Sequence, residues 1–326
     1  MSTTRQDLVK AYVDDAYGWA MEAYDEEATI FDQLFDVENS EGAYEQYTTA
    51  IGPNRLTETA EAAQIDRTTA TEGFTVYCAN KKFAIELPIS NEAIDDNRKV
   101  ENFLRAWAKD LGEAARTTKE EVHANLFNKG GFTAGHSVFN NDIAGGVLTT
   151  YTDPKLCYDG KPFLNITGNA RTAKHGGTYF NGQLVLTLDS TALQTATKRV
   201  SVTNAYNEAG RKISIVPNII LVQLHSDNWW TAKRIVESSG DTSATHSGVA
   251  NLYKNFRVIG WPYLTDSDAW FVGKALKGLK SLARMPLAID YYEEKRVDSQ
   301  VVRARVRFGC AVTNFRYWFG ANFSQS

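Results

Sequence analysis

One apolar stripe runs along the whole of a predicted helix over residues 97–129, and it restricts the fold more than any other feature. At 1.5 Å per residue this helix would be a rod of roughly 50 Å. Asp96 or Asn97 can cap its start, and Gly130–Gly131 supplies its stop. A helix with a single apolar stripe packs with that side alone, so we expect it to lie across a sheet. The stripe consists of Val100, Phe103, Leu104, Trp107, Leu111, Ala115, Val122 and Leu126.

The stretch from Gly42 to Gly73 has the opposite character. It is rich in Thr, Glu, Ala and Gln, and it has no large hydrophobic face. A segment of this kind cannot bury enough apolar surface to fold alone. We therefore expect it to be either disordered or a long extension that a partner orders.

Charge is distributed unevenly along the chain. Residues 1–72 contain 16 acidic and four basic residues, a net of −12; the whole chain has −4, so the remainder carries +8. Residues 5–25 have the spacing of an amphipathic helix, and Asp25, Glu26 and Glu27 follow at its end. This acidic arm is either a solvated helix or a segment that lies on the basic body of a neighbouring copy, where complementary charge would set the register of assembly.

Strands are predicted on both sides of the long helix. Alternating residues indicate strands over 74–78 and 83–87, and in 302–308 the apolar residues face one way and Arg303, Arg305 and Arg307 the other. Between them, residues 131–275 mix short strands and helices, with Asp189 and Asp227 as candidate caps and a buried strand within 213–222. No repeat is visible. The predicted class is α+β, with one contiguous unit inserted into another.

The composition excludes several classes of protein. A chain of 326 residues can bury a sizeable core without disulfides or metals. Cys78, Cys157 and Cys310 are too widely separated for a zinc site or a disulfide framework, so we expect free thiols in a reducing cytosol. The polar start and the absence of a long apolar run predict a soluble protein made in a cytoplasm, with no membrane partner.

The residues give little support for catalysis. Gly130–Ser137 has the glycine and serine spacing of a phosphate-binding loop, but His136 stands where the lysine belongs, and the loop follows a helix instead of a strand. The five histidines show no metal-ligand spacing, and His123 is expected to be a hydrogen-bonded core residue. Nucleophile-elbow and dinucleotide motifs are absent. We therefore predict no catalytic residues, no cofactor and no metal.

The best basic surface is the arginine face of the predicted strand, with Arg316 beyond it. Arg303, Arg305, Arg307 and Arg316 are candidates for contact with another subunit or with DNA on the inside of a shell. Because the chain has no basic tail, any contact with DNA would be weak and would not read sequence.

The order of seven motifs carries a resemblance. They occupy residues 42–47 (Gly-Ala-Tyr-Glu-Gln-Tyr), 83–90 (Phe-Ala-Ile-Glu-Leu-Pro-Ile-Ser), 114–120 (Ala-Ala-Arg-Thr-Thr-Lys-Glu), 158–163 (Tyr-Asp-Gly-Lys-Pro-Phe), 210–217 (Gly-Arg-Lys-Ile-Ser-Ile-Val-Pro), 219–222 (Ile-Ile-Leu-Val) and 261–271 (Trp-Pro-Tyr-Leu-Thr-Asp-Ser-Asp-Ala-Trp-Phe). Over about residues 35–326 the chain resembles the major capsid proteins of tailed bacteriophages, with the Hong Kong 97-type fold. More narrowly, it is similar to the major head subunit of Mu-like phages.

The resemblance implies a role for each part. Residues 1–40 would be an N-terminal arm, 41–86 an extended E-loop hairpin, 87–130 with 276–326 the P-domain, whose spine helix is about 97–129, and 131–275 the A-domain. The chain would assemble through pentamers and hexamers into an icosahedral shell around double-stranded phage DNA, within a virion built in the host cytoplasm. Asp25, Glu26 and Glu27 would contact another subunit.

The same resemblance implies partners beyond the chain itself. They are a separate scaffolding protein, a portal, an optional decoration protein, and packaged DNA held by weak non-specific contact. Three alternatives stay open from the sequence. One is an encapsulin-like shell of a cellular compartment, and another is a nucleotide-dependent enzyme that uses the 130–137 loop. The third is a soluble α+β binding protein that would be a monomer or dimer.

Overall fold

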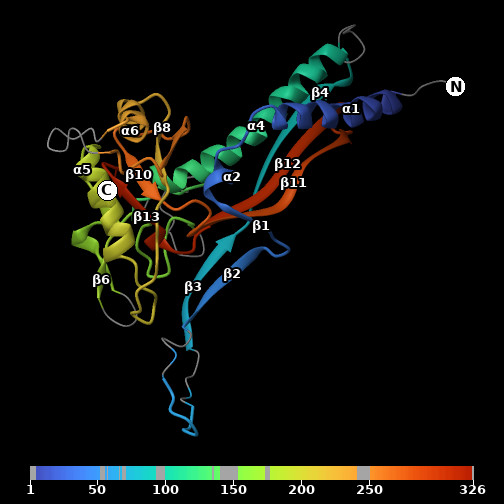
Figure 1. Cartoon of the computed structure of the whole chain (residues 1–326). Coiled ribbons are helices and arrows are strands. Elements are labelled where there is room, and N and C mark those ends of the chain that lie inside the picture. The colour runs from blue at the N-terminus through green and yellow to red at the C-terminus, as the bar shows by residue number, and fades with distance from the viewer. Residues whose placement is uncertain are drawn as a thin grey trace.

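The computed structural model shows an elongated α+β protein from which one hairpin protrudes (Figure 1). The described residues are 5–51, 56, 58–65, 67, 71–92, 100–133, 136–139, 153–172, 177–240 and 250–324. Two sheets organise this part of the chain, a long one that lies under two helices and a second, more compact one at the opposite end. The predicted α+β class is confirmed.

The longest strands form a four-stranded sheet in the order β1-β11-β12-β4. These strands are β1 (Asp36–Asn39), β11 (Leu279–Glu294), β12 (Ser299–Val312) and β4 (Lys81–Ser90). β12 runs antiparallel to both of its neighbours, and β1 runs parallel to β11. The predicted alternation in β12 is confirmed, because Val302, Ala304, Val306 and Phe308 are buried whereas the arginines between them are partly exposed.

Helices α1 (Arg5–Asp25) and α4 (Val100–Asn128) lie side by side on one face of this sheet (Figure 1). The predicted helix over 5–25 is confirmed. The long helix is confirmed from residue 100 onward, and its candidate caps Asp96 and Asn97 lie outside the described residues. The expectation that it crosses a sheet is also confirmed.

Small residues bring the two helices together. A Cβ atom placed on Gly112 of α4 would overlap the backbone carbonyl of Ala20 in α1, so the helix backbones meet there without an intervening side chain. Leu111, Ala20 and Ala115 form a cluster with Leu287 and Ala304 of the sheet. The N-terminal helix is therefore packed on the long helix of its own chain.

The hairpin consists of β2 (Tyr44–Ile51) and β3 (Thr71–Ala79), which pair antiparallel and project away from the body (Figure 1). β2 lies in the stretch without periodicity, so of the two alternatives expected there, disorder does not hold for residues 44–51. β3 and β4 are separated by Asn80 alone and join different sheets. Residues 81–86, assigned to the hairpin from the sequence, therefore belong to β4 in the long sheet.

The base of the hairpin is anchored on the sheet face opposite the helices. Val76 and Cys78 pack against Leu282 and Ala311 of that face. The buried Asn80 amide donates hydrogen bonds to Ser40 Oγ (2.7 Å) and to the Gly42 carbonyl (3.0 Å). Beyond this base the described tip residues 56, 58–65 and 67 are exposed.

The second sheet has the order β7-β13-β10-β8-β9. Its strands are β7 (Gly182–Gln183), β13 (Trp318–Ala321), β10 (Trp270–Gly273), β8 (Ile219–Gln223) and β9 (Arg257–Trp261), and around it lie α5 (Ser190–Lys198), α6 (Asp227–Glu237) and the small β5–β6 pair (Arg171–Thr172 and Thr178–Tyr179). β13 comes from residues 276–326, which the sequence analysis grouped with the long helix and not with residues 131–275. The chain thus returns to the second sheet at its end.

Of three local predictions in this region, one is confirmed and two need correction. Asp189 caps α5 as predicted, since its side chain accepts a hydrogen bond from the Ala192 N–H (2.6 Å). In α6 the cap is Ser226, which accepts from the Trp229 N–H (3.2 Å), and Asp227 is the first helical residue. The predicted strand within 213–222 begins only at residue 219, because Pro217 cannot donate to a ladder.

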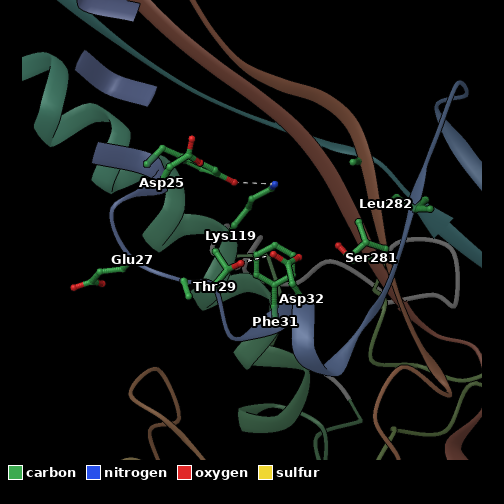
Figure 2. Close-up of a pocket in the computed structure, with 12 residues that line it drawn as sticks. Asp25, Glu27, Thr29, Phe31, Asp32, Lys119, Ser281 and Leu282 are labelled. Carbon is green, nitrogen blue, oxygen red and sulfur yellow. Dashed lines mark hydrogen bonds between the residues drawn. The ribbon is translucent and has the colours of Figure 1, made fainter. Parts of the chain in front are cut away.

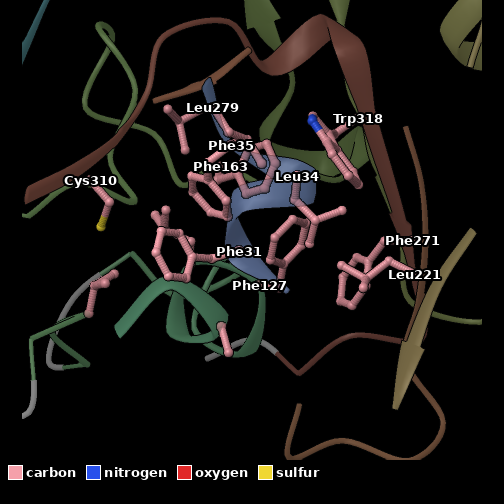
Figure 3. Packing of buried hydrophobic residues seen from close by; sticks show 14 of the residues in the cluster. Phe31, Leu34, Phe35, Phe127, Phe163, Leu221, Phe271, Leu279, Cys310 and Trp318 are labelled. Carbon is pink, nitrogen blue, oxygen red and sulfur yellow. The ribbon is translucent and has the colours of Figure 1, made fainter. Parts of the chain in front are cut away.

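The core joins the two sheets through the C-terminal end of α4. Phe127 packs against the rings of Phe163, Phe271 and Trp318, with centroid separations of 5.1–5.8 Å. Figure 3 shows these rings together with Phe31, Leu34 and Phe35, which come from the short helix α2 (Phe31–Leu34) and the residue after it. The long helix, the arm and both sheets therefore share one hydrophobic core.

Candidate assembly surfaces

The acidic turn, Asp25–Glu27, joins α1 to α2 and is exposed to solvent (Figure 2). Glu27 pairs with Arg116 of α4 at 3.0 Å, and this arginine side chain is almost fully buried. Within the described residues Asp25 and Glu26 form no ion pair. The acidic turn therefore has one carboxylate engaged by its own chain and two that face solvent.

A pocket of about 270 Å³ lies beneath this turn, between the arm, α4 and β11. Lys119 is the cation in its lining, and its amine donates to the Tyr24 hydroxyl (3.0 Å) and lies over the ring of Phe31 (5.5 Å from the centroid). Figure 2 shows Lys119 pointing from α4 toward the end of α1. The lysine thus holds the arm against α4.

Glu120 is a buried carboxylate that the sequence analysis missed. Its Oε1 accepts hydrogen bonds from the Ile30 N–H (2.6 Å) and the Phe31 N–H (3.5 Å), and its Oε2 accepts from Trp261 Nε1 (2.6 Å). Burial raises the pKa of this carboxyl, an effect that these hydrogen bonds oppose. One side chain therefore ties the arm, the long helix and the second sheet together.

His123 is a core residue, as predicted. It is fully buried, its Nδ1 donates to the Lys119 carbonyl (2.7 Å), and its Nε2 accepts from the Ser281 hydroxyl (2.8 Å). Its ring stacks on Phe31, with 4.4 Å between centroids. Burial lowers the pKa of this imidazole to about 3, so it is neutral at physiological pH.

The arginine ladder, Arg303–Arg305–Arg307, occupies the face of the long sheet away from the helices. Arg303 and Arg305 both pair with Asp290 of β11, at 3.2 and 2.9 Å. Arg307 lies opposite Lys82 in the register and pairs with no carboxylate among the described residues. The ladder therefore holds more positive charge than its own strand neighbours neutralise.

Arg316 does not belong to this surface. Only 2% of it is exposed, and its guanidinium pairs with Glu208 at 2.5 Å while lying over the rings of Phe315 and Tyr179. The sequence interpretation that placed it among surface contacts is wrong, because the 3₁₀ turn at Phe315–Tyr317 points it into the core. Its role is an internal ion pair.

In the 130–137 loop the nearby lysine amines are bonded to backbone carbonyls and are not directed at a phosphate site. Lys129 and Lys155 donate their amines to the backbone carbonyls of Ser137 (2.7 Å) and His136. A Cβ atom would overlap the Leu126 carbonyl at Gly130, and the Phe323 ring and the Ser324 carbonyl at Gly131. Ala134 and Gly135 lie outside the described residues. The lysines are thus used to hold the loop, and the nucleotide-dependent alternative gains no support.

The described part of the chain was also searched for disulfides, metal sites and membrane-spanning helices. Cys78, Cys157 and Cys310 are free and buried, and burial raises the pKa of each thiol. No group of three or more His, Cys, Asp and Glu side chains in the described ranges is arranged to hold a metal ion. No described helix is long and apolar enough to cross a membrane. His175 and His246 lie outside the described residues.

Two solved structures with a similar architecture are described as capsids. The capsid structure of the cyanophage P-SCSP1u aligns with a TM-score of 0.51 and 13% identity, over 92% of this chain and 89% of that one. The capsid of a native GTA particle aligns with a TM-score of 0.52 and 13% identity, over 89% and 88%. A search of curated proteins found no match. At this identity the likeness defines the fold, which is the Hong Kong 97-type capsid fold.

The family follows from the sequence itself. Residues 73–320, about three quarters of the chain, match the phage capsid protein family, and the chain belongs to that family. It is a structural, non-catalytic protein of the virion that builds the icosahedral capsid shell by self-assembly. The encapsulin-like and enzymatic alternatives are thereby set aside.

Proposed function

We propose that this subunit forms hexamers and pentamers that tile a shell around double-stranded DNA delivered by a packaging motor. Many identical copies that meet through heterologous contacts form rings, and rings of two sizes close a shell. A mildly acidic chain suits a shell that is filled after it is built. It does not suit a capsid that condenses on its nucleic acid.

Each part of the fold has a role in this proposal. The β2–β3 hairpin is the E-loop, the long sheet with α4 is the P-domain, and the second sheet, β13 included, is the A-domain around the ring axes. The arm up to residue 40 is the N-terminal arm, and its acidic turn contacts a neighbouring subunit. These roles adjust the sequence-based ranges at β4 and β13, which pair within the long sheet and the second sheet respectively.

The observation that carries the proposal is the exposed tip of the hairpin. Leu56 is 90% exposed and Ile65 is 75% exposed, at the end of a hairpin whose described contacts with the body include Val76, Cys78 and Phe74. Large apolar side chains on a protruding element mark a surface for another protein. Since the family self-assembles, the partner that fits is a second copy.

Further partners follow from the same proposal. We also propose a separate scaffolding protein, as the resemblance of the sequence motifs to tailed-phage capsid proteins implies. A portal, an optional decoration protein and weak non-specific contact with DNA complete the set. The narrower relation to Mu-like phages is supported by the order of the sequence motifs alone.

Electron microscopy of purified protein, alone and with co-expressed scaffolding protein, tests the proposal. We expect rings of five and six subunits and closed shells only when scaffolding is present. Leu56→Asp with Ile65→Asp is expected to abolish shells without changing the melting temperature of the subunit, because neither side chain packs on its own chain. Val216→Asp, at a site 64% exposed outside the hairpin, is the matched control.

Three results would contradict it. A wild-type chain that stays monomeric at high concentration with scaffolding removes the ring proposal. Wild-type shells from the hairpin variant remove the role of the tip. Closed shells from the chain expressed alone remove the separate scaffolding protein.

A further inference from the structure

The two faces of the long sheet differ in chemistry and in what covers them. Ala304 and Leu287 point to the helix face and pack with α1 and α4. Arg303, Arg305 and Arg307 alternate with the buried residues of β12, so they lie on the other face. Among the described residues, the hairpin base covers that face at its end near Ala311. The arginine ladder continues beyond this cover.

The positive charge of the arginine ladder is only partly neutralised by its own chain. One carboxylate, Asp290, serves both Arg303 and Arg305, whose side chains keep 30% and 35% of their surface exposed. The Nε atoms of all three arginines have no hydrogen-bond acceptor. Since Arg307 stands beside Lys82 without a carboxylate in the described part of the chain, the excess charge increases toward that end.

The acidic turn is the complementary surface, and it belongs to the helix side of the molecule. Asp25 is the last residue of α1, which packs against the helix face of the sheet, and Glu26 follows it. Their carboxylates are exposed and form no ion pair among the described residues. Because the sheet stands between the acidic turn and the arginine ladder, the two cannot meet within one chain.

We propose that the arginine ladder of one subunit binds the acidic turn of a second copy. This inference rests on the proposed contact between the arm and a neighbouring subunit, and it names the surface that receives the arm. Surfaces of opposite charge on opposite sides of one molecule make a heterologous contact, which repeats from copy to copy and closes into rings or tiles. Each exposed ion pair is weak, but a shell repeats it many times.

DNA is the other polyanion near a capsid protein, and the ladder suits it less. Asp290 lies within the ladder, and Glu86 stands opposite Arg303 in the register. These carboxylates would face a DNA backbone that carries one negative charge per about 1.7 Å along the duplex. A short acidic segment can instead place its few carboxylates near Arg305 and Arg307 and leave Asp290 where it is.

Charge reversal on each side, followed by reversal on both, tests the contact. Arg305→Glu with Arg307→Glu, and separately Asp25→Lys with Glu26→Lys, are expected to lower shell yield at least tenfold at 0.15 M salt. The chain that carries all four changes is expected to recover the yield. Glu22→Lys with Lys109→Glu reverses an exposed pair of α1 and α4 and is the control expected to change nothing.

A disulfide trap covers the case in which a charge-reversed chain fails to fold. Mixing Glu26→Cys subunits with Arg305→Cys subunits during assembly should give a disulfide-linked dimer that neither variant gives alone. Wild-type shells in the same experiment establish assembly itself, so failure of the proposed function is recognised separately. Absence of the mixed dimer from shells overturns the pairing. The pairing is also overturned if the Arg305→Glu, Arg307→Glu variant forms shells in normal yield and these shells lack only their DNA.

Discussion

Gly112→Ala should release the arm from the long helix even though alanine is the better helix former. In the interior of α4 the change from glycine to alanine favours the helix by about 1 kcal/mol. The added Cβ, however, overlaps the backbone carbonyl of Ala20, and a backbone cannot rotate away as a side chain can. Overpacking of this kind costs about 3 kcal/mol at the upper end of its usual range. The net loss of arm docking is about 2 kcal/mol.

Hydrogen exchange measures that loss directly. Amides in the second half of α1, residues 15–25, are protected by docking on α4, and a loss of about 2 kcal/mol speeds their exchange roughly 30-fold. Gly18→Ala is the matched control, because a Cβ there meets nothing within 4 Å and the helix gain stands alone. We expect exchange about fivefold slower in that variant.

The same change from glycine to alanine is therefore expected to speed amide exchange in α1 at Gly112 and to slow it at Gly18. Slower exchange in Gly112→Ala, as in Gly18→Ala, would refute the close approach of the two helices. A uniform change across the whole chain would show that the arm does not open separately from the body.

Three other predictions concern buried groups of the core. His123 is neutral in the folded protein with a pKa of about 3, against 6.5 unfolded, so falling pH favours the unfolded state between these values by about 2 kcal/mol at pH 5. Urea unfolding at pH 7 and pH 5 should show this difference in the wild type and lose it in His123→Phe. Glu120→Gln should cost about 2 kcal/mol in the same assay, because an NH₂ group replaces an oxygen that accepts from Ile30 or Trp261, and equal stability would exclude its joining role. Arg316→Ala should cost about 3 kcal/mol by leaving the mostly buried Glu208 without its partner, and a variant that also carries Glu208→Ala should recover part of it.

Elements with one buried face were predictable from the sequence. α4 and β12 each bury one side against the body of their own chain, and the periods of 3.6 and 2 appear in their residues. The sequence pattern did not predict β2, because this strand has no face buried against the body. Its partner is the single strand β3, and exposed threonines such as Thr48 and Thr49 line the pair, so no hydrophobic alternation is required. The resemblance to capsid proteins supplied what periodicity could not.

Buried polar groups escaped the sequence analysis because their partners are distant in the chain. Glu120 lies on α4 and serves backbone donors 89 and 90 residues away and an indole 141 residues away. Nothing in the residues around it distinguishes it from Glu121, which is not buried. Burial of a carboxylate is set by the packing of arm against helix and helix against sheet, and this packing is known only from the fold.

The arginine ladder shows where prediction from sequence ends. Alternation placed Arg303, Arg305 and Arg307 on one face, but it did not identify Asp290 as the carboxylate that the first two share. That partner depends on the register of β11 against β12, which shifts twice between Ala283 and Ala288. Each shift of one residue moves side chains to the other face of a strand. Without these irregularities a different part of β11 would lie opposite the ladder, so its unneutralised charge is a property of the folded sheet.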